Sequence, residues 1–115
     1  MDPQEQEPHG AAESLANIRT RASKGELRVT QHALQEMVQK NISLDEVLEA
    51  ISTGEILENY PWHRRGPCCL LYGRTESGRD VHIVCTTIQP MLVIITAYEP
   101  RPPKWLTPRR RSGRT

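Results

Sequence analysis

The stretch Asp80–Pro100, DVHIVCTTIQPMLVIITAYEP, decides the fold expected of this chain. It contains two apolar runs rich in β-branched residues, separated at Gln89–Pro90, which predicts two strands joined by a turn. In both runs, apolar residues occur at odd and at even positions, so both faces of each strand carry apolar side chains. A strand with one face in water would alternate apolar and polar residues. The second face is therefore either partly covered or in contact with another molecule. We look for a functional site on this face, because His82 and Tyr98 lie on the two strands.

The register of this hairpin decides whether His82 and Tyr98 share a face. A two-residue loop at Gln89–Pro90 would place His82 opposite Ala97, whereas a three-residue loop ending at Met91 would place it opposite Tyr98. Proline is disfavoured at the second central position of the common tight turn. The longer loop, with His82 opposite Tyr98, is therefore the prediction.

Three helices are expected before the strands. An apolar stripe over residues 12–22 ends at a glycine stop, Gly25. Thr30 can cap the next helix, VTQHALQEMVQKN, which Asn41 can end in the left-handed conformation. Ser43, followed by Glu three residues later, forms a capping box before a helix that closes at Thr53–Gly54. The buried face of the second helix is predicted from its apolar residues: Ala33, Leu34, Met37 and Val38.

After the third helix, the spacing of apolar residues changes from the helical pattern to that of β-strands. The segments EILENYP and PCCLLYGRT precede the two runs of the opening stretch, and all four are short and separated by turn residues. Short connections between successive strands imply an antiparallel meander. The predicted class is α+β, with about three N-terminal helices packed on one face of an antiparallel sheet of about four strands.

The formal net charge of +1 hides an uneven distribution along the 115 residues. Residues 1–10 are acidic and polar and are expected to be disordered, while residues 11–101 are expected to form a single domain. Residues 102–115 form a basic tail rich in Pro and Arg, expected to be mobile beyond Trp105. The tail arginines either attract phosphate by counterion release or simply keep the tail solvated. They include Arg109, Arg110 and Arg111.

Several classes of protein are disfavoured by composition. The longest apolar runs fall short of the roughly 18 residues of a membrane span, and the N-terminus lacks the pattern of a signal peptide, so we expect a cytoplasmic protein without membrane attachment. The three cysteines are in neither CxxC nor Cys/His ligand spacing. We therefore expect reduced thiols, no metal site and no cofactor.

Two histidines fall within predicted regular structure, His32 in the first turn of the second helix and His82 on a strand. A histidine in such a position is more often a hydrogen-bonded structural residue than a catalyst, but it is also the side chain best suited to proton transfer near neutral pH. Tyr98 likewise either anchors a strand end or donates a hydrogen bond to phosphate.

The loop NYPWHRRG combines an aromatic side chain, Trp62, with Arg64 and Arg65. An exposed aromatic ring beside guanidinium groups can stack unpaired bases and hold phosphates. The alternative is that Trp62 covers the edge of a small core.

The segments TQHALQEM, NISLDEVLEAISTGEILENYP, GRDVHIVC and VIITAYEP resemble an uncharacterised bacterial family, number four-two-five-eight among the domains of unknown function. The resemblance covers roughly Val29–Pro100. It implies similarity to RelE-like ribonuclease toxins of toxin–antitoxin pairs, whose helices cover one side of a sheet and leave the other for RNA. Members are often encoded beside a small zinc-finger antitoxin-like protein. The family's recurrent positions correspond to His32, His82, Thr96 and Tyr98, and members tend to have Arg where this chain has Glu36.

Two functions are therefore expected as alternatives. The first is a metal-independent, toxin-like endoribonuclease acting on RNA or on the ribosome, with His82 as base or acid, Tyr98 as its partner and His32 as a second candidate. Its cations would be Arg64, Arg65 and Arg79. The second is a non-catalytic module that binds RNA through the basic tail and pairs its open sheet face with a protein partner or a second copy of the chain.

Overall fold

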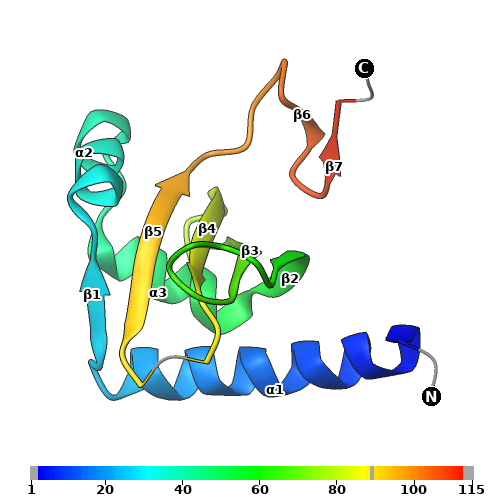
Figure 1. Cartoon of the computed structure of the whole chain (residues 1–115). Helices are drawn as coiled ribbons and strands as arrows, with labels where there is room; N and C mark the ends of the chain where they lie inside the picture. The colour runs from blue at the N-terminus through cyan, green and yellow to red at the C-terminus, as the bar shows by residue number, and fades with distance from the viewer. Residues whose placement is uncertain (1–2, 89, 113–115) are drawn as a thin grey trace.

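The computed structural model describes residues 3–88 and 90–112, with side chains from Ala12 onward. A five-stranded sheet, in the order β1-β5-β4-β3-β2, forms the centre of the molecule (Figure 1). The elements in chain order are α1 (Pro3–Ser23), β1 (Leu27–Val29), α2 (Gln31–Lys40), α3 (Leu44–Thr53), β2 (Glu55–Tyr60), β3 (Cys68–Arg74), β4 (Asp80–Thr86), β5 (Leu92–Tyr98), β6 (Trp105–Thr107) and β7 (Arg110–Arg111).

The α+β class and the three helices are confirmed, but the sheet differs from the prediction in two respects. It has five strands rather than four, and β1 pairs with β5 in parallel, so the sheet is mixed. The strand β1 has three residues, too few to show a period of two, and its partner lies far away in the sequence. Its pairing is therefore a tertiary property that no local pattern indicates.

The predicted helix caps are present. The Thr30 side chain accepts a hydrogen bond from the backbone of Ala33, and Ser43 and Glu46 form both bonds of a capping box. Asn41 ends α2 with φ of 57°, in the left-handed region that asparagine tolerates. These caps depend on neighbours along the chain, which explains why the sequence predicts them.

The predicted buried stripe of α2 is partly wrong. Ala33 and Met37 are buried, but Leu34 is 51% exposed and Val38 is 76% exposed. The helix α2 packs mainly on β5, at one side of the sheet. Because α2 packs mainly on this one strand, its buried stripe is narrower than the apolar stripe in its sequence.

One face of the sheet, called here the helix face, packs against the three helices. The helix α3 lies on β3 and α1 lies on α3, so the main core is formed between these layers. At Gly73 a side chain is impossible, because an added Cβ would lie 1.8 Å from the carbonyl oxygen of Ala50 in α3. The sheet contributes the following buried side chains to this core: Cys69, Leu71, Val81, Ile83, Cys85, Leu92, Ile94 and Ala97.

The opposite face, called here the strap face, is contacted around His82 and Tyr72 by residues 101–112, which we call the strap. Residues 102–115 were expected to be a basic tail that is mobile beyond Trp105, but β6 and β7 form a small antiparallel pair and Trp105 is 2% exposed. In Figure 1 this pair lies at the opposite end of the molecule from α1. The strap packs because its aromatic and charged side chains find partners on the sheet, described below.

The N-terminal segment also differs from the expectation of disorder over residues 1–10. The helix α1 begins at Pro3, and Met1 and Asp2 lie outside the described residues. Gln and Glu are good helix formers, and proline suits the first helical position. Within the described part of the chain, no helix is long and apolar enough to cross a membrane.

Candidate functional site

The predicted pairing of His82 with Tyr98 across the β4–β5 hairpin is confirmed. On its other side His82 pairs with Tyr72 of β3, so the three side chains form one row on the strap face. The connection is longer than the three residues expected, since β4 ends at Thr86 and β5 begins at Leu92. An irregularity between Val84 and Cys85 shifts the register by one residue near the loop.

His82 lies at the centre of this row and is fully buried. Its Nε2 lies 2.6 Å from the carbonyl oxygen of Pro108 in the strap, and its Nδ1 lies 3.2 Å from Tyr98 Oη. A carbonyl oxygen only accepts, so Nε2 carries the proton and Nδ1 accepts from the tyrosine hydroxyl. Burial lowers the pKa of His82, although the bond to Pro108 opposes this shift. His82 is thus a neutral imidazole with both nitrogens occupied.

Aromatic rings surround this imidazole. Trp105 of the strap lies edge-on to it, with ring centroids 4.4 Å apart, and Tyr98 and Tyr72 lie at 5.2 and 5.8 Å. The indole nitrogen of Trp105 is the one buried side-chain polar atom without a hydrogen-bond partner in the described part of the chain. The strap face that we expected to be open is therefore closed over His82.

Two of the three tail arginines proposed to bind RNA hold the strap in place. Arg109 Nε lies 2.6 Å from Glu55 Oε1, and its guanidinium lies over the ring of Tyr72. Arg111 Nε lies 2.7 Å from Glu58 Oε2, and its guanidinium lies over the strap tryptophan. The bond from Arg111 lowers the pKa of Glu58. Arg110, between them in sequence, is exposed.

Arg79 is also committed to structure. Its guanidinium contacts Glu99 at 2.7 Å and Glu46 at 3.1 Å, and it donates to the carbonyl oxygens of Lys40 and Asn41 at the end of α2. The bond from Arg79 is the main cause of the lowered pKa of Glu99. Arg79 thus ties α2, α3 and β5 together, and a phosphate would have to compete with two carboxylates for it.

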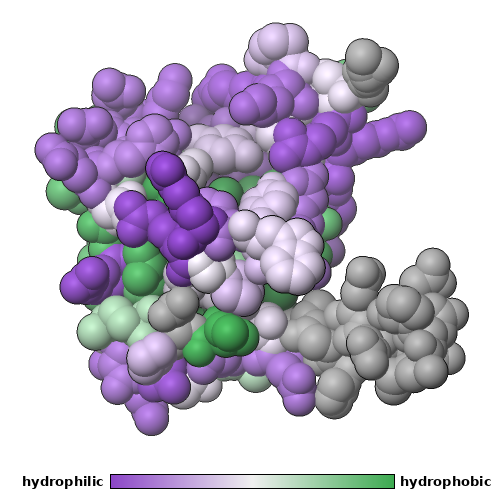
Figure 2. All heavy atoms as spheres, viewed as in Figure 1, coloured by the Kyte–Doolittle hydropathy of each residue, from purple (hydrophilic) through white to green (hydrophobic). Residues whose placement is uncertain are grey.

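A cleft of about 530 Å³, called here the strap cleft, lies between α2, the end of β5 and the strap. It brings together two of the three predicted catalytic residues, His32 and Tyr98, whereas His82 lies behind Tyr98. In Figure 2, hydrophilic residues cover most of the upper part of the molecule, where Figure 1 shows α2 and the strap. The cleft is lined by His32, Glu36, Lys40, Thr96, Tyr98, Glu99, Arg101, Pro102, Lys104 and Trp105.

His32 and Glu36 form a pair one helical turn apart at this cleft. His32 Nε2 lies 3.5 Å from Glu36 Oε1, and the His32 side chain is 66% exposed. Glu36 Oε1 also accepts a hydrogen bond from the backbone of Ala97 in β5, at 3.1 Å. Glu36 therefore satisfies a strand-edge donor and lies within ion-pair distance of an exposed imidazole. The sequence did not indicate this role, because Ala97 lies 61 positions away from Glu36.

Tyr98 lines the strap cleft, and its hydroxyl group contacts Nδ1 of His82. Burial is the main cause that raises the pKa of Tyr98. Because its proton is donated to Nδ1 of His82, its oxygen is left to accept a hydrogen bond. The row therefore positions Tyr98, and the cations around it are Lys40, Arg101 and Lys104.

The predicted base-stacking loop lies elsewhere, between β2 and β3. Trp62 is 93% exposed, and Arg64 and Arg65 are exposed beside it. The loop is tied to the β4–β5 connection by the backbone bond from Thr87 to the carbonyl oxygen of Pro67. Trp62 thus does not cover the core, and Arg65 lines a second cleft at the start of β5.

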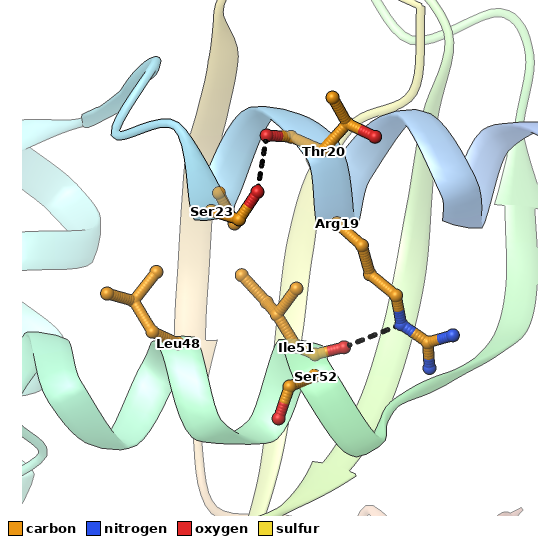
Figure 3. Close-up of a pocket in the computed structure, with 7 residues that line it drawn as sticks. Arg19, Thr20, Ser23, Leu48, Ile51 and Ser52 are labelled. Atoms are coloured by element: carbon orange, nitrogen blue, oxygen red, sulfur yellow. Dashed lines mark hydrogen bonds between the residues drawn. The ribbon is translucent and has the colours of Figure 1, made fainter.

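A larger cavity, of about 570 Å³, lies between α1 and α3 (Figure 3). Figure 3 shows Leu48 and Ile51 of α3 facing α1. Its charged residue, Arg19, donates to the carbonyl oxygens of Ile51 at 3.3 Å and Gly54 at 2.7 Å, which caps the end of α3. This cavity holds no acid–base side chain, so the strap cleft is the better candidate site.

Within the described part of the chain, no group of three or more His, Cys, Asp or Glu side chains could hold a metal ion. All three cysteines are free thiols buried in the sheet.

Comparison with known proteins gives one family. The family model "Domain of unknown function (DUF4258)" matches residues 29–99, which include β1 through β5 and the α2 side of the strap cleft. No curated protein and no solved structure is significantly similar to the chain.

Proposed function

We propose, from the premise that this chain belongs to the family Domain of unknown function (DUF4258), that it is a metal-independent endoribonuclease and that the strap cleft is its RNA site. The observation that carries the proposal is the exposed His32–Glu36 pair in a cleft that also holds cationic side chains. The resemblance of the family to RelE-like toxins, drawn from the sequence, supplies the reaction class. It also suggests RNA or the ribosome as target and a small zinc-finger antitoxin-like protein as partner.

The reaction requires a base, a cation and an acid around one phosphate. His32 would take the proton of a ribose 2′-hydroxyl, with Glu36 holding its Nε2–H so that Nδ1 is left as the base. The 2′-oxygen attacks the adjacent phosphorus and the bond to the 5′-oxygen breaks, which leaves a 2′,3′-cyclic phosphate and a 5′-hydroxyl. Lys40 and Lys104 would stabilise the charged phosphorane, and one of these ammonium groups would protonate the leaving oxygen.

In this proposal His82 is a positioning residue rather than a catalytic one. It is buried, and its two nitrogens are bonded to Tyr98 and to the strap. It holds the Tyr98 hydroxyl and the cleft wall that carries Lys104. The sequence proposed the opposite order of importance for the two histidines.

The test is cleavage of a mixed-sequence, end-labelled RNA in the presence of EDTA, with and without ribosomes. His32→Ala is expected to reduce cleavage by about 10²- to 10⁴-fold. Because His32 is exposed, the melting temperature of the His32→Ala variant should stay close to that of the wild type. Gln35→Ala, an exposed change on the same helix outside the cleft, is the matched control and should cleave normally. Equal cleavage by His32→Ala and wild type would show that His32 is not part of the active site.

The second candidate is a non-catalytic RNA-binding module. The observation that favours it is the 93% exposure of Trp62 beside two arginines, which suits base stacking without chemistry. Wild-type protein that binds RNA but cleaves nothing with or without ribosomes would support it. In that case Trp62→Ala should weaken RNA binding by about 1 to 3 kcal/mol.

A further inference from the structure

The strand β5 has a cleft near each of its ends. The strap cleft lies at Thr96 and Tyr98, and the second cleft, of about 340 Å³, lies at Val93. We call the second one the arginine cleft, and it is lined by Arg28, Val29, Thr30, Gln31, Arg65 and Val93. Gln31 of this lining immediately precedes His32 of the strap cleft, so the two clefts adjoin at the start of α2.

The β1–β5 register explains why Arg28 points into this cleft. Arg28 pairs with Val93, so their side chains share a face of the sheet. Leu27 and Val29 pack against the helix-face core, and Arg28 between them is exposed. The Arg28 side chain therefore lies on the same face of the sheet as Tyr98, beside the opposite end of β5.

The lining of the arginine cleft contains two guanidinium groups and no carboxylate. The strap cleft differs in this respect, because Glu36 and Glu99 are part of its lining. Two guanidinium groups that line one hollow attract an anion, and arginine is the side chain best suited to a phosphate.

The spacing of the clefts limits what could occupy both. Val93 and Tyr98 are five residues apart on one strand, or about 17 Å at the usual strand rise. A stacked nucleic acid strand advances about 3.4 Å for each nucleotide, so at most about five nucleotides would span the two sites. The loop that supplies Arg65 also carries the exposed Trp62, which suits an unpaired base rather than one within a duplex.

We infer that the arginine cleft is a phosphate subsite, and that the substrate is a single-stranded RNA segment running along β5 from this subsite to the strap cleft. This inference rests on the proposed function of the strap cleft and adds the class of substrate and a new binding residue, Arg28.

The test measures binding of fluorescein-labelled 2′-O-methyl RNA, which lacks the nucleophile and is not cleaved. Fluorescence anisotropy is recorded with a single-stranded hexanucleotide. Arg28→Ala should weaken hexanucleotide binding by about tenfold and reduce the salt slope by about 0.7, the change expected when the protein neutralises one phosphate fewer on a single strand.

Lys24→Ala is the matched control, since it removes one exposed positive charge that lines neither cleft, and thermal melts check that both variants fold. If Arg28→Ala and Lys24→Ala bind the hexanucleotide equally well, the inference is overturned while His32-dependent cleavage still stands. A blunt duplex that binds as tightly as the single strand, with the same dependence on Arg28, would overturn the substrate class. Wild-type protein that neither binds the hexanucleotide nor cleaves RNA would remove the proposed function and this inference together.

Discussion

The two faces of the sheet are covered by different kinds of contact. The helix face is buried by aliphatic side chains of three helices, among them Ile18, Val47 and Ile51, whose packing has no strict direction. The strap face is covered by one short segment through directed contacts, such as His82 to Pro108 and the ion pairs of the strap arginines. The packing of the helix face depends on the apolar area that is buried. The packing of the strap face depends on specific hydrogen-bond and ion-pair partners and on their protonation. The two faces should therefore respond differently to mutation, pH and salt.

Removing the strap should have the largest effect. A chain ending at Arg101 loses the burial of Trp105, which is worth about 3 to 5 kcal/mol by analogy with large-to-small core changes. We expect its melting temperature to fall by more than about 10 °C. Circular dichroism melts would measure this, with a chain ending at Ser112 as control. An unchanged melting temperature would mean that the strap does not hold to the sheet.

His82 and Ile83 are neighbours on β4 that face opposite sides of the sheet, so they allow a matched comparison. His82→Ala should lower the free energy of unfolding by about 1 to 3 kcal/mol, because it leaves the carbonyl of Pro108 and the hydroxyl of Tyr98 without a partner. Ile83→Ala on the helix face should cost about 2 to 5 kcal/mol. Urea unfolding would measure both. A His82→Ala protein as stable as the wild type would show that the imidazole is not part of the strap contact.

Variants of His82 and Ile83 should also differ in how their free energy of unfolding depends on pH. Because burial lowers the pKa of His82 in the folded state, the unfolded chain binds this proton more readily. The free energy of unfolding should therefore decrease as pH falls through 6.5, the ordinary value for histidine. The paired carboxylates act in a separate window, below their ordinary value of 4.5.

Urea unfolding at pH 7.5 and 5.5 would test this dependence. Ile83→Ala should keep the decrease between the two pH values, whereas His82→Gln should lose most of it. An equal decrease in the two variants would assign the pH dependence to other groups.

The smallest effect is expected from the strap ion pairs. Arg111→Gln should cost under about 1 kcal/mol, because the Arg111 side chain is 47% exposed and solvent screens its pair with Glu58. Its effect should shrink further in 1 M NaCl. Arg110→Gln, next to it and exposed, is the matched control and should change nothing. Chemical unfolding at low and high salt would measure both, and a salt-independent loss would assign the role of Arg111 to packing over Trp105.

The candidate site was only partly predictable. His32 and Tyr98 were named from the sequence and share the strap cleft. The predicted pairing of His82 with Tyr98 is present, but it arises from the irregularity between Val84 and Cys85 rather than from a three-residue loop. The contact of Glu36 with the backbone of Ala97 could not be predicted, since it joins a helix to a strand edge. The closing of the strap face by Trp105 was also missed, because a segment rich in Pro and Arg has no periodicity to indicate packing.

What the sequence by itself determined are the features whose partners lie within a few residues: the caps of α2 and α3, the strand hairpin, and the α+β class. Capping bonds join residues within one or two turns of chain, so the sequence alone contains the information for them. Only the tertiary structure decided which histidine is exposed and which is buried. That outcome depends on where a distant segment docks, since the Pro108 carbonyl lies 26 positions from His82, and no local pattern encodes a contact at that separation.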